Sequence, residues 1–168
     1  MQGAGRAGDD GSGRLPLSIR EARREDAPRI AALILLGAAD QPLSSEDAAR
    51  EAGDPVYLEA FDAVAASPDS TLFVAEQAGE VVGTLQVTLI PGLAARGRRR
   101  AKFESVHVAP ERRGLGIGAA MIAFALDFAR SNGAGLVELS SNKSRTDAHR
   151  FYRNLGFDQS HEGFKIVP

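Results

Sequence analysis

The spacing of apolar residues changes several times along the chain, and each change marks a predicted element. In the segment LPLSIREA near the start, apolar and polar residues alternate, which predicts a short strand. After Arg24 the apolar residues recur at the spacing of one helical face, and Gly37 stands where such a helix can end. One strand followed by one helix therefore opens the predicted fold.

The segment that begins at Ser44 predicts two more helical pieces. Ser44 or Ser45 can cap the first piece, and acidic residues follow in its first turn. The sequence Gly53 to Pro55 interrupts the helical spacing, and the second piece ends before Pro68. Helices are therefore predicted for most of the chain between the first strand and the middle of the sequence.

The middle of the chain changes to an alternating pattern rich in β-branched residues. Residues 71–77 and 80–90 predict two strands, and the short segment AGE between them favours a hairpin. Residues 102–110 predict a further strand. Strict alternation along this strand predicts two faces, one with Glu104, Val106 and Val108 and the other with Phe103, Ser105 and His107.

The last third of the chain alternates between the two periods. Apolar residues recur at helical spacing from Ile117, and the segment SNGAG ends that helix. LVELSS predicts a strand, TDAHRFYRNLGF predicts a helix that stops at Gly156, and FKIVP predicts a closing strand. The order of elements, with no internal repeat, predicts a mixed α/β (α+β) fold.

Length and composition limit the number of domains and the partners. A chain of 168 residues with 43% apolar content predicts one core and a single domain over 15–168, while the Gly- and Asp-rich residues 1–14 predict a flexible tail. A net charge of −2 argues against nucleic acid or an anionic membrane as a partner. No apolar run suits a membrane span or a signal peptide, and the absence of cysteine excludes disulfides and thiolate metal sites. We therefore expect a soluble, cytoplasmic protein.

The segment RRGLGIGAAM places Gly114, Gly116 and Gly118 between a predicted strand and a predicted helix. A Walker-type triphosphate loop needs a lysine after its last glycine, but Ala119 and Ala120 stand there. A dinucleotide turn fits only loosely, because that turn follows the first strand of a repeating unit. Bare backbone at the start of a helix suits an anion, and a tight turn without a ligand stays open as the alternative.

Together with the later segment AHRFYRNLGF, this turn resembles the GNAT superfamily of acetyl-CoA-dependent N-acetyltransferases. The family signature of Gln or Arg, two residues, Gly, one residue and Gly or Ala is met by Arg113, Gly116 and Gly118. The family's aromatic pair before a Gly-Phe is met by Phe151, Tyr152, Gly156 and Phe157. The resemblance covers residues 15–168 and implies the GNAT acyltransferase fold, a mixed, largely antiparallel sheet of six to seven strands flanked by about four helices.

The resemblance also implies a binding site for acetyl-CoA as co-substrate. The strand before the turn would lie along the thioester and the pantetheine arm, and the turn would wrap the pyrophosphate with backbone N–H groups. Arg112 is either a second phosphate contact or a solvated charge. The implied cofactor-binding residues are Val106, His107, Val108, Arg113, Gly114, Leu115, Gly116, Ile117, Gly118 and Ala119.

Two residues match positions where the family keeps its acid and base. Tyr152 matches the usual donor of a proton to the departing thiolate, and the pKa values of a phenol and a thiol are close enough for that step. Glu104 matches the position of a general base that acts directly or through water. A core tyrosine and a solvated carboxylate are the alternative interpretations.

The sequence departs from the family pattern seven residues before Tyr152. Many family members keep an Asn there that helps to hold the cofactor, whereas this chain has Arg145. Either Arg145 or Asn142, the nearest asparagine, takes over the contact with the cofactor, or neither does. The departure affects only the contacts that the implied site would make with the adenine and pantetheine groups of the cofactor.

The resemblance implies transfer of an acetyl group from acetyl-CoA to a primary amine by direct attack in a ternary complex, with a small-molecule amine as the expected acceptor. The absence of cysteine fits, because no thiol acyl-enzyme can form. The alternatives are another acyl group, a protein N-terminus or lysine as acceptor, and a non-catalytic acyl-CoA-binding sensor. Family members often pair through their C-terminal strands, so a homodimer is a further expectation.

The remaining polar residues suggest weaker hypotheses. His149 and His161 lack partners at metal-ligand spacing, so we expect no metal site. The arginine loop, with Arg96, Arg98, Arg99 and Arg100, either favours an acidic or phosphate-bearing substrate or is a solvated loop, and it lacks the aromatic residues of a nucleic-acid surface. The identity of the amine is not predicted.

Overall fold

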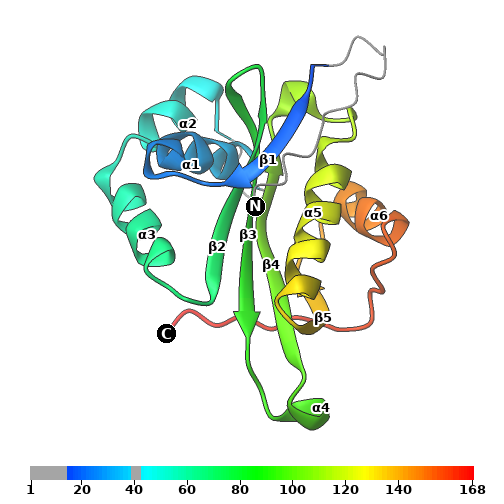
Figure 1. Cartoon of the computed structure of the whole chain (residues 1–168). Coiled ribbons are helices and arrows are strands. Elements are labelled where there is room, and N and C mark those ends of the chain that lie inside the picture. The colour runs from blue at the N-terminus through cyan, green and yellow to red at the C-terminus, as the bar shows by residue number, and fades with distance from the viewer. Residues whose placement is uncertain (1–14, 39–42) are drawn as a thin grey trace, which may run out of the picture.

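The computed structural model describes residues 15–38 and 43–168, and its centre is a five-stranded mixed sheet (Figure 1). The strands lie side by side in chain order, antiparallel except that the last runs parallel to its neighbour. They are β1 (Leu17–Glu21), β2 (Ser70–Gln77), β3 (Glu80–Ile90), β4 (Arg99–Val108) and β5 (Ala134–Leu139). The predicted tail, residues 1–14, lies outside the described residues.

Helices cover both faces of this sheet (Figure 1). One face carries α1 (Ala27–Leu36), α2 (Ser45–Glu51) and α3 (Pro55–Ala65), which follow the 3-10 turn η1 (Arg24–Asp26). The other carries α5 (Ile117–Ser131) and α6 (Thr146–Asn154), and the 3-10 turn η2 (Pro110–Arg112) precedes α5. The four-residue α4 (Ala94–Gly97) lies at the tip of the long β3–β4 hairpin. The predicted mixed α/β architecture is confirmed.

Alternation along the central strands sends apolar side chains to two separate cores. Phe103 of β4 and Leu85 of β3 pack with Met121 of α5 on one face, and all three are almost fully buried. On the opposite face, Val74 of β2 packs with Phe61 of α3 and with α1. The helices on both faces are therefore held by burial of apolar surface, at roughly 25 cal/mol per Å² removed from water.

The hairpin turn, the helix cap and the helix break that were predicted from local sequence are all present in the structure. Ala78 and Gly79, with φ of 51° and 80°, form the two-residue turn of the β2–β3 hairpin, which confirms the predicted hairpin. The Oγ atom of Ser44 accepts a hydrogen bond from the backbone N–H of Asp47 at 3.1 Å and caps α2. The break before Pro55 separates α2 from α3 as predicted.

The expected count of six to seven strands is wrong, because the described residues form five. The segment FKIVP has the alternation of a strand, but no described strand pairs with residues 157–168. Phe164, Ile166 and Val167 are each at least 90% exposed. Alternation alone does not make a strand, since a strand also needs a neighbour with which to exchange backbone hydrogen bonds.

A β-bulge in β4 overturns the predicted alternation of its faces. His107 pairs with Thr84 and Glu104 pairs with Gln86, so two residues of β4 oppose a single residue of β3. Ser105, inside this bulge, has a φ of 52°. Paired residues of an antiparallel ladder share a face, so His107 and Glu104 lie together on the α1 side.

Because of the same bulge, Val106 and Val108 lie on the opposite face of β4 from Glu104, with which they were predicted to share a face. Val106 and Val108 pack against the α5-side core, the core that also contains Phe103. The prediction that Phe103 shares a face with His107 is therefore wrong. The extra residue at the bulge shifts the alternation by one position.

Candidate functional site

The site begins where β4 and β5 separate. The parallel pairing of these strands ends at Phe103 and Leu139, whereas β4 stays paired with β3 as far as Val108. Residues 104–108 therefore have a strand on one side, and among the described residues no strand pairs with their other edge. A groove of about 720 Å³ opens beside this free edge, between β4, the turn before α5 and the start of α6.

The glycine-rich turn forms one end of the groove and begins α5. Gly114 and Gly116 have φ of 77° and 84°, a left-handed backbone that costs residues with a Cβ about 1–2 kcal/mol. Gly116 is the N-cap of α5, so the first N–H groups of this helix lack partners within the helix. These donors and the positive end of the helix dipole make the turn suitable for an anion.

Two arginines accompany the turn in the groove. Arg112 and Arg113 both line it, and the Nε atom of Arg113 donates a hydrogen bond to the carbonyl oxygen of Val108 at 3.1 Å. This bond fixes the turn to the end of β4. The donor chemistry, backbone N–H groups together with guanidinium groups, fits a phosphate-bearing ligand.

Tyr152 of α6 lines the groove on the side opposite β4, and its ring is held by two other aromatic side chains. The ring makes edge-to-face contacts with Phe151 and Phe157, with centroid distances of 5.1 and 5.8 Å. Burial raises the pKa of the Tyr152 phenol, and the positive charge of Arg145 opposes that rise. Tyr152 is therefore a protonated phenol at neutral pH and can donate a proton into the groove.

Arg145 lines the same groove at the N-cap of α6. Its side chain is partly buried, and no carboxylate among the described residues pairs with it. The groove's acidic side chain, Asp147, pairs instead with Arg150. The groove thus has an excess of positive charge.

The opposite face of β4 carries the other polar candidates. The His107 ring lies against the end of α1, where a Cβ on Gly37 would be 2.0 Å from its Nδ1 atom. Burial, together with the charges of Arg145 and Arg113, lowers the pKa of His107 to about 4. Glu104 is 41% exposed and pairs with Lys102 at 2.8 Å. One face of β4 therefore carries a neutral imidazole and a carboxylate. The groove opens on the other face, beside the free edge of the strand.

The structure brings most of the predicted site residues together around this groove. The groove is lined by the predicted residues Val106, Val108, Arg113, Gly114, Gly116, Ile117, Gly118, Ala119, Arg145 and Tyr152. The side chains of Glu104 and His107 lie on the other face of β4, and Leu115 and Asn142 do not line the groove. Asn142 instead accepts hydrogen bonds from Ser144 in the loop before α6.

One wall of the groove is formed by the first turn of α6 and the loop before it, and it was not predicted from the sequence. The residues of this wall that were not candidate site residues are Ser144, Thr146, Asp147 and Ala148. The signal that points to them is positional, because the predicted helix TDAHRFYRNLGF begins at Thr146. A helix whose middle contributes Tyr152 to a groove can also present its N-terminal turn there.

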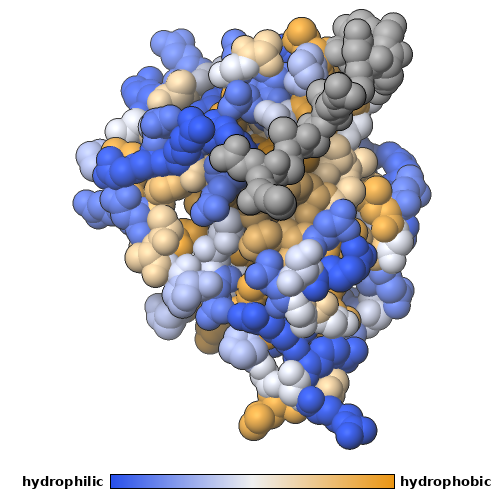
Figure 2. Space-filling model, in the orientation of Figure 1, coloured by the Kyte–Doolittle hydropathy of each residue, from blue (hydrophilic) through white to orange (hydrophobic). Residues whose placement is uncertain are grey.

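The arginine loop contributes to packing and to ion pairs. Arg99 pairs with Asp69 at 3.0 Å and Arg100 pairs with Glu138 at 3.0 Å, while the stem of Arg98 packs over Gly135. At the hairpin tip, where Figure 2 shows apolar beside strongly polar surface, Leu93 is 97% exposed. Arg99 and Arg100, which were predicted to lie in a loop, are therefore the first residues of β4 and form ion pairs within the protein.

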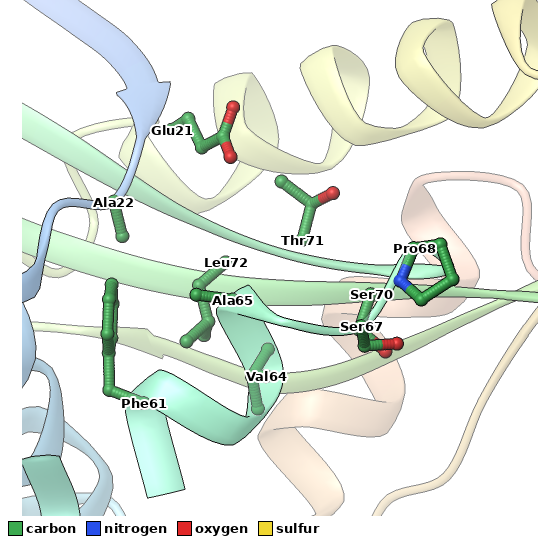
Figure 3. Close-up of a pocket in the computed structure, with 10 residues that line it drawn as sticks. All are labelled: Glu21, Ala22, Phe61, Val64, Ala65, Ser67, Pro68, Ser70, Thr71 and Leu72. Carbon is green, nitrogen blue, oxygen red and sulfur yellow. The ribbon is translucent and has the colours of Figure 1, made fainter. Parts of the chain in front are cut away.

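A second cavity, of about 130 Å³, lies between α3 and the edge of β1 and β2 (Figure 3). Among the described residues that line it, Glu21 is the only one with an ionisable side chain, and the others are apolar or hydroxyl-bearing. Within residues 15–38 and 43–168, no group of three or more His, Asp and Glu is arranged to hold a metal ion. The chemistry-bearing side chains of the described chain therefore gather at β4 and its groove.

Comparison with known proteins agrees with this geometry. The profile of the Acetyltransferase (GNAT) family matches residues 39–157. The chain belongs to the GNAT acetyltransferase family. As a GNAT acetyltransferase it is an acyltransferase enzyme, and family members use acetyl-CoA as co-substrate.

Individual GNAT relatives match over different lengths. The aminoalkylphosphonate N-acetyltransferase of Salmonella typhimurium is 33% identical over 146 residues, 87% of this chain and 88% of that protein. The glucosamine 6-phosphate N-acetyltransferase of Trypanosoma brucei brucei is 33% identical over 91 residues, 54% of this chain and 59% of that protein. A crystal structure described as a transcriptional regulator from Bacillus halodurans superposes with a TM-score of 0.81 at 33% identity, covering 90% of this chain and 99% of that one.

Among the helices of this GNAT chain that fall within the described residues, none has the length and apolar character that crossing a bilayer requires.

Proposed function

We propose that this GNAT chain transfers an acetyl group from acetyl-CoA to a primary amine by direct attack in a ternary complex. The observation that carries the proposal is the placement of Tyr152 across the groove from the free edge of β4, with the glycine turn at one end. A thioester laid along Val106 and Val108 would meet backbone donors and acceptors on β4 and a proton donor on α6. Of the residues predicted to bind the cofactor, those that line the groove would contact acetyl-CoA in this proposal.

The turn fits the diphosphate portion of the co-substrate. Gly114, Gly116 and Gly118 leave room for an anion to approach the backbone, and the free N–H groups at the start of α5 point into this space. Arg112 and Arg113 add charge-assisted contacts to phosphate oxygens. Bound acetyl-CoA would supply the activated acetyl group.

Tyr152 and Glu104 would then carry out the proton transfers. The amine nitrogen bonds to the acetyl carbon while the carbon–sulfur bond breaks, and Tyr152 donates its phenolic proton to the sulfur. Before this attack the ammonium loses one proton to Glu104, directly or through water, and becomes the neutral amine. After the bond to carbon has formed, the nitrogen releases a second proton to water, from which Tyr152 is reprotonated. Because the Glu104 side chain lies on the α1 face of β4, the amine would approach from that face and the thioester from the groove.

A small amine that carries a phosphonate or phosphate group is the acceptor class we propose first. The two relatives named above are N-acetyltransferases of an aminoalkylphosphonate and of glucosamine 6-phosphate. Protein N-termini and lysines are the rival acceptors, and a sensor domain that binds acyl-CoA without turnover is the rival from another class.

A thiol-release assay over a panel of amines tests this proposal. The panel contains aminoalkylphosphonates, amino-sugar phosphates, the corresponding amines without the anionic group, polyamines, aminoglycosides and peptides. We expect release of free coenzyme A with the anionic amines at lower KM than with their uncharged analogues. Binding of acetyl-CoA in calorimetry without turnover of any amine would support the sensor domain instead.

We also propose a homodimer that forms through the C-terminal segment. Phe164, Ile166 and Val167 are exposed and have strand-like alternation, so a second copy of the chain can bury them by strand pairing. We expect light scattering to give twice the mass of one chain, and a variant that lacks residues 164–168 to give a single-chain mass. A monomeric full-length protein would contradict this expectation.

A further inference from the structure

Arg145 occupies an electrostatically unfavourable position. It stands at the N-cap of α6, where the helix dipole already presents partial positive charge. The start of α5 and the guanidinium groups of Arg112 and Arg113 line the same groove. A partly buried guanidinium among other positive charges costs free energy unless an anion lies close to it.

The acidic side chain that lines the groove does not supply that anion. Asp147, on the first turn of α6, pairs with Arg150. Among the described residues, Arg145 has neither a carboxylate partner nor a side-chain hydrogen bond to the backbone of its own helix. Within the described part of the chain, the Arg145 guanidinium is therefore available to act on a negative charge that appears in the groove.

The charge of Arg145 reaches both sides of the reaction centre defined above. It favours the ionised form of Tyr152 in the groove, and it disfavours the protonated form of His107 on the opposite face of β4. These two side chains flank the free edge of β4. Among the described residues, Arg112, Arg113 and Asp147 line the groove together with Arg145, and Glu104 shares the α1 face of β4 with His107.

We propose that the Arg145 guanidinium stabilises the negative charge that develops on the acetyl carbonyl oxygen and on the departing sulfur during transfer. The nitrogen–carbon bond forms, the carbon–sulfur bond breaks, and the sulfur takes the phenolic proton of Tyr152. Glu104 takes the first proton of the ammonium, and the second proton, which the nitrogen releases after it bonds to carbon, passes to water, from which Tyr152 is reprotonated. Arg145 exchanges no proton and acts by its charge alone.

This inference rests on the proposed acetyl transfer and differs from a role of Arg145 in holding the cofactor. A cofactor contact would chiefly affect the KM for acetyl-CoA. A charge that acts on the developing anion affects kcat, because that charge appears only as the bond to sulfur breaks. The two roles can therefore be separated by measurement.

A spectroscopic titration tests the electrostatic part without any substrate. The chain has two tyrosines and no tryptophan, so in a Tyr57→Phe background the ultraviolet absorbance of tyrosinate reports Tyr152 alone. Arg145→Gln is expected to move the Tyr152 titration to higher pH, because the phenolate loses a stabilising cation. Arg145→Lys keeps the charge and Arg153→Gln removes a charge from the same helix outside the groove, so both should leave the titration in place.

Kinetics with the best amine of the panel completes the test. Arg145→Gln is expected to lower kcat by about a hundred-fold and to leave the KM for acetyl-CoA within a factor of about two. Arg145→Lys should recover most of kcat. An unmoved Tyr152 titration in folded Arg145→Gln, or a raised KM with unchanged kcat, overturns the role. Wild-type protein that acetylates no amine refutes the proposed function and this role together, whereas full kcat in Arg145→Gln refutes the role alone.

Discussion

A Cβ atom on Gly37 would lie 2.0 Å from the Nδ1 atom of His107, so the end of α1 rests directly on the imidazole ring. His107 belongs to the segment of β4 whose outer edge is free, and it pairs with the buried Thr84 on the inner side. The contact therefore ties α1 to the strand that the proposed thioester would follow. The bulge at Ser105 makes it possible, because without the extra residue the His107 side chain would point to the other face.

We expect Gly37→Ala to destabilise the protein by about 1–3 kcal/mol, since the added methyl group overlaps the half-buried His107 ring. Urea unfolding measures the change. Gly92→Ala is the matched control, because a Cβ at Gly92 would meet nothing within 4 Å. In a His107→Ala background the cost of Gly37→Ala should fall. An equal cost in both backgrounds would show that the ring is not the cause.

Stability should decline in mild acid because of His107. Its pKa is about 4 in the folded chain against 6.5 as the usual value, so the unfolded chain binds a proton first as the pH falls. The free energy of unfolding is then fully retained above pH 6.5 and decreases towards pH 4, with a slope of at most about 1.4 kcal/mol per pH unit from this group. His107→Asn should flatten the unfolding free energy over that interval, and an unchanged slope would contradict the assignment.

Gly116→Asp should abolish measurable binding of acetyl-CoA. The substitution places a carboxylate beside the N–H groups that would receive the diphosphate, and it strains the left-handed backbone. Gly79→Asp is the matched control, because Gly79 has a φ of 80° and no neighbour within 4 Å but lies in the β2–β3 turn. Calorimetry should show wild-type affinity for the Gly79 variant, and retained affinity in the Gly116 variant would refute the site.

Tyr152→Phe should lower kcat by about ten- to a hundred-fold, of the size expected for loss of a general acid. The ring contacts with Phe151 and Phe157 are kept, so affinity for acetyl-CoA should change little. Steady-state kinetics and calorimetry measure the two quantities on the same preparation. Full activity of the phenylalanine variant would assign Tyr152 to packing alone.

Glu104→Gln should lose activity at neutral pH and regain part of it at alkaline pH, where the amine is deprotonated without help. Lys102→Gln is the control, because it removes the 2.8 Å ion pair and leaves the carboxylate in place. The pH dependence of kcat/KM for both variants decides the matter. A ratio of Glu104→Gln to wild type that is constant across pH would exclude a role as base.

Much of the site could be predicted from the sequence because its signals are local. The glycines of the turn, the apolar face of α5 and the aromatic pair of α6 each depend on residues a few positions apart. The β2–β3 hairpin is equally local, since its two turn residues and the flanking alternation suffice. These features gave the order of elements and most of the groove lining.

The remaining features depend on partners that are distant in the chain. The bulge at Ser105 exists only relative to β3, so alternation within β4 alone assigned His107 and Phe103 to the same face. The segment FKIVP has the composition of a strand and lacks a described neighbour. Arg145 and Tyr152 are seven positions apart, at the start of α6 and within it, so helical spacing alone brings them to one face, but only the separation of β4 from β5 opens a groove beside them. Local pattern determines which elements can form, and tertiary pairing decides which faces and charges meet.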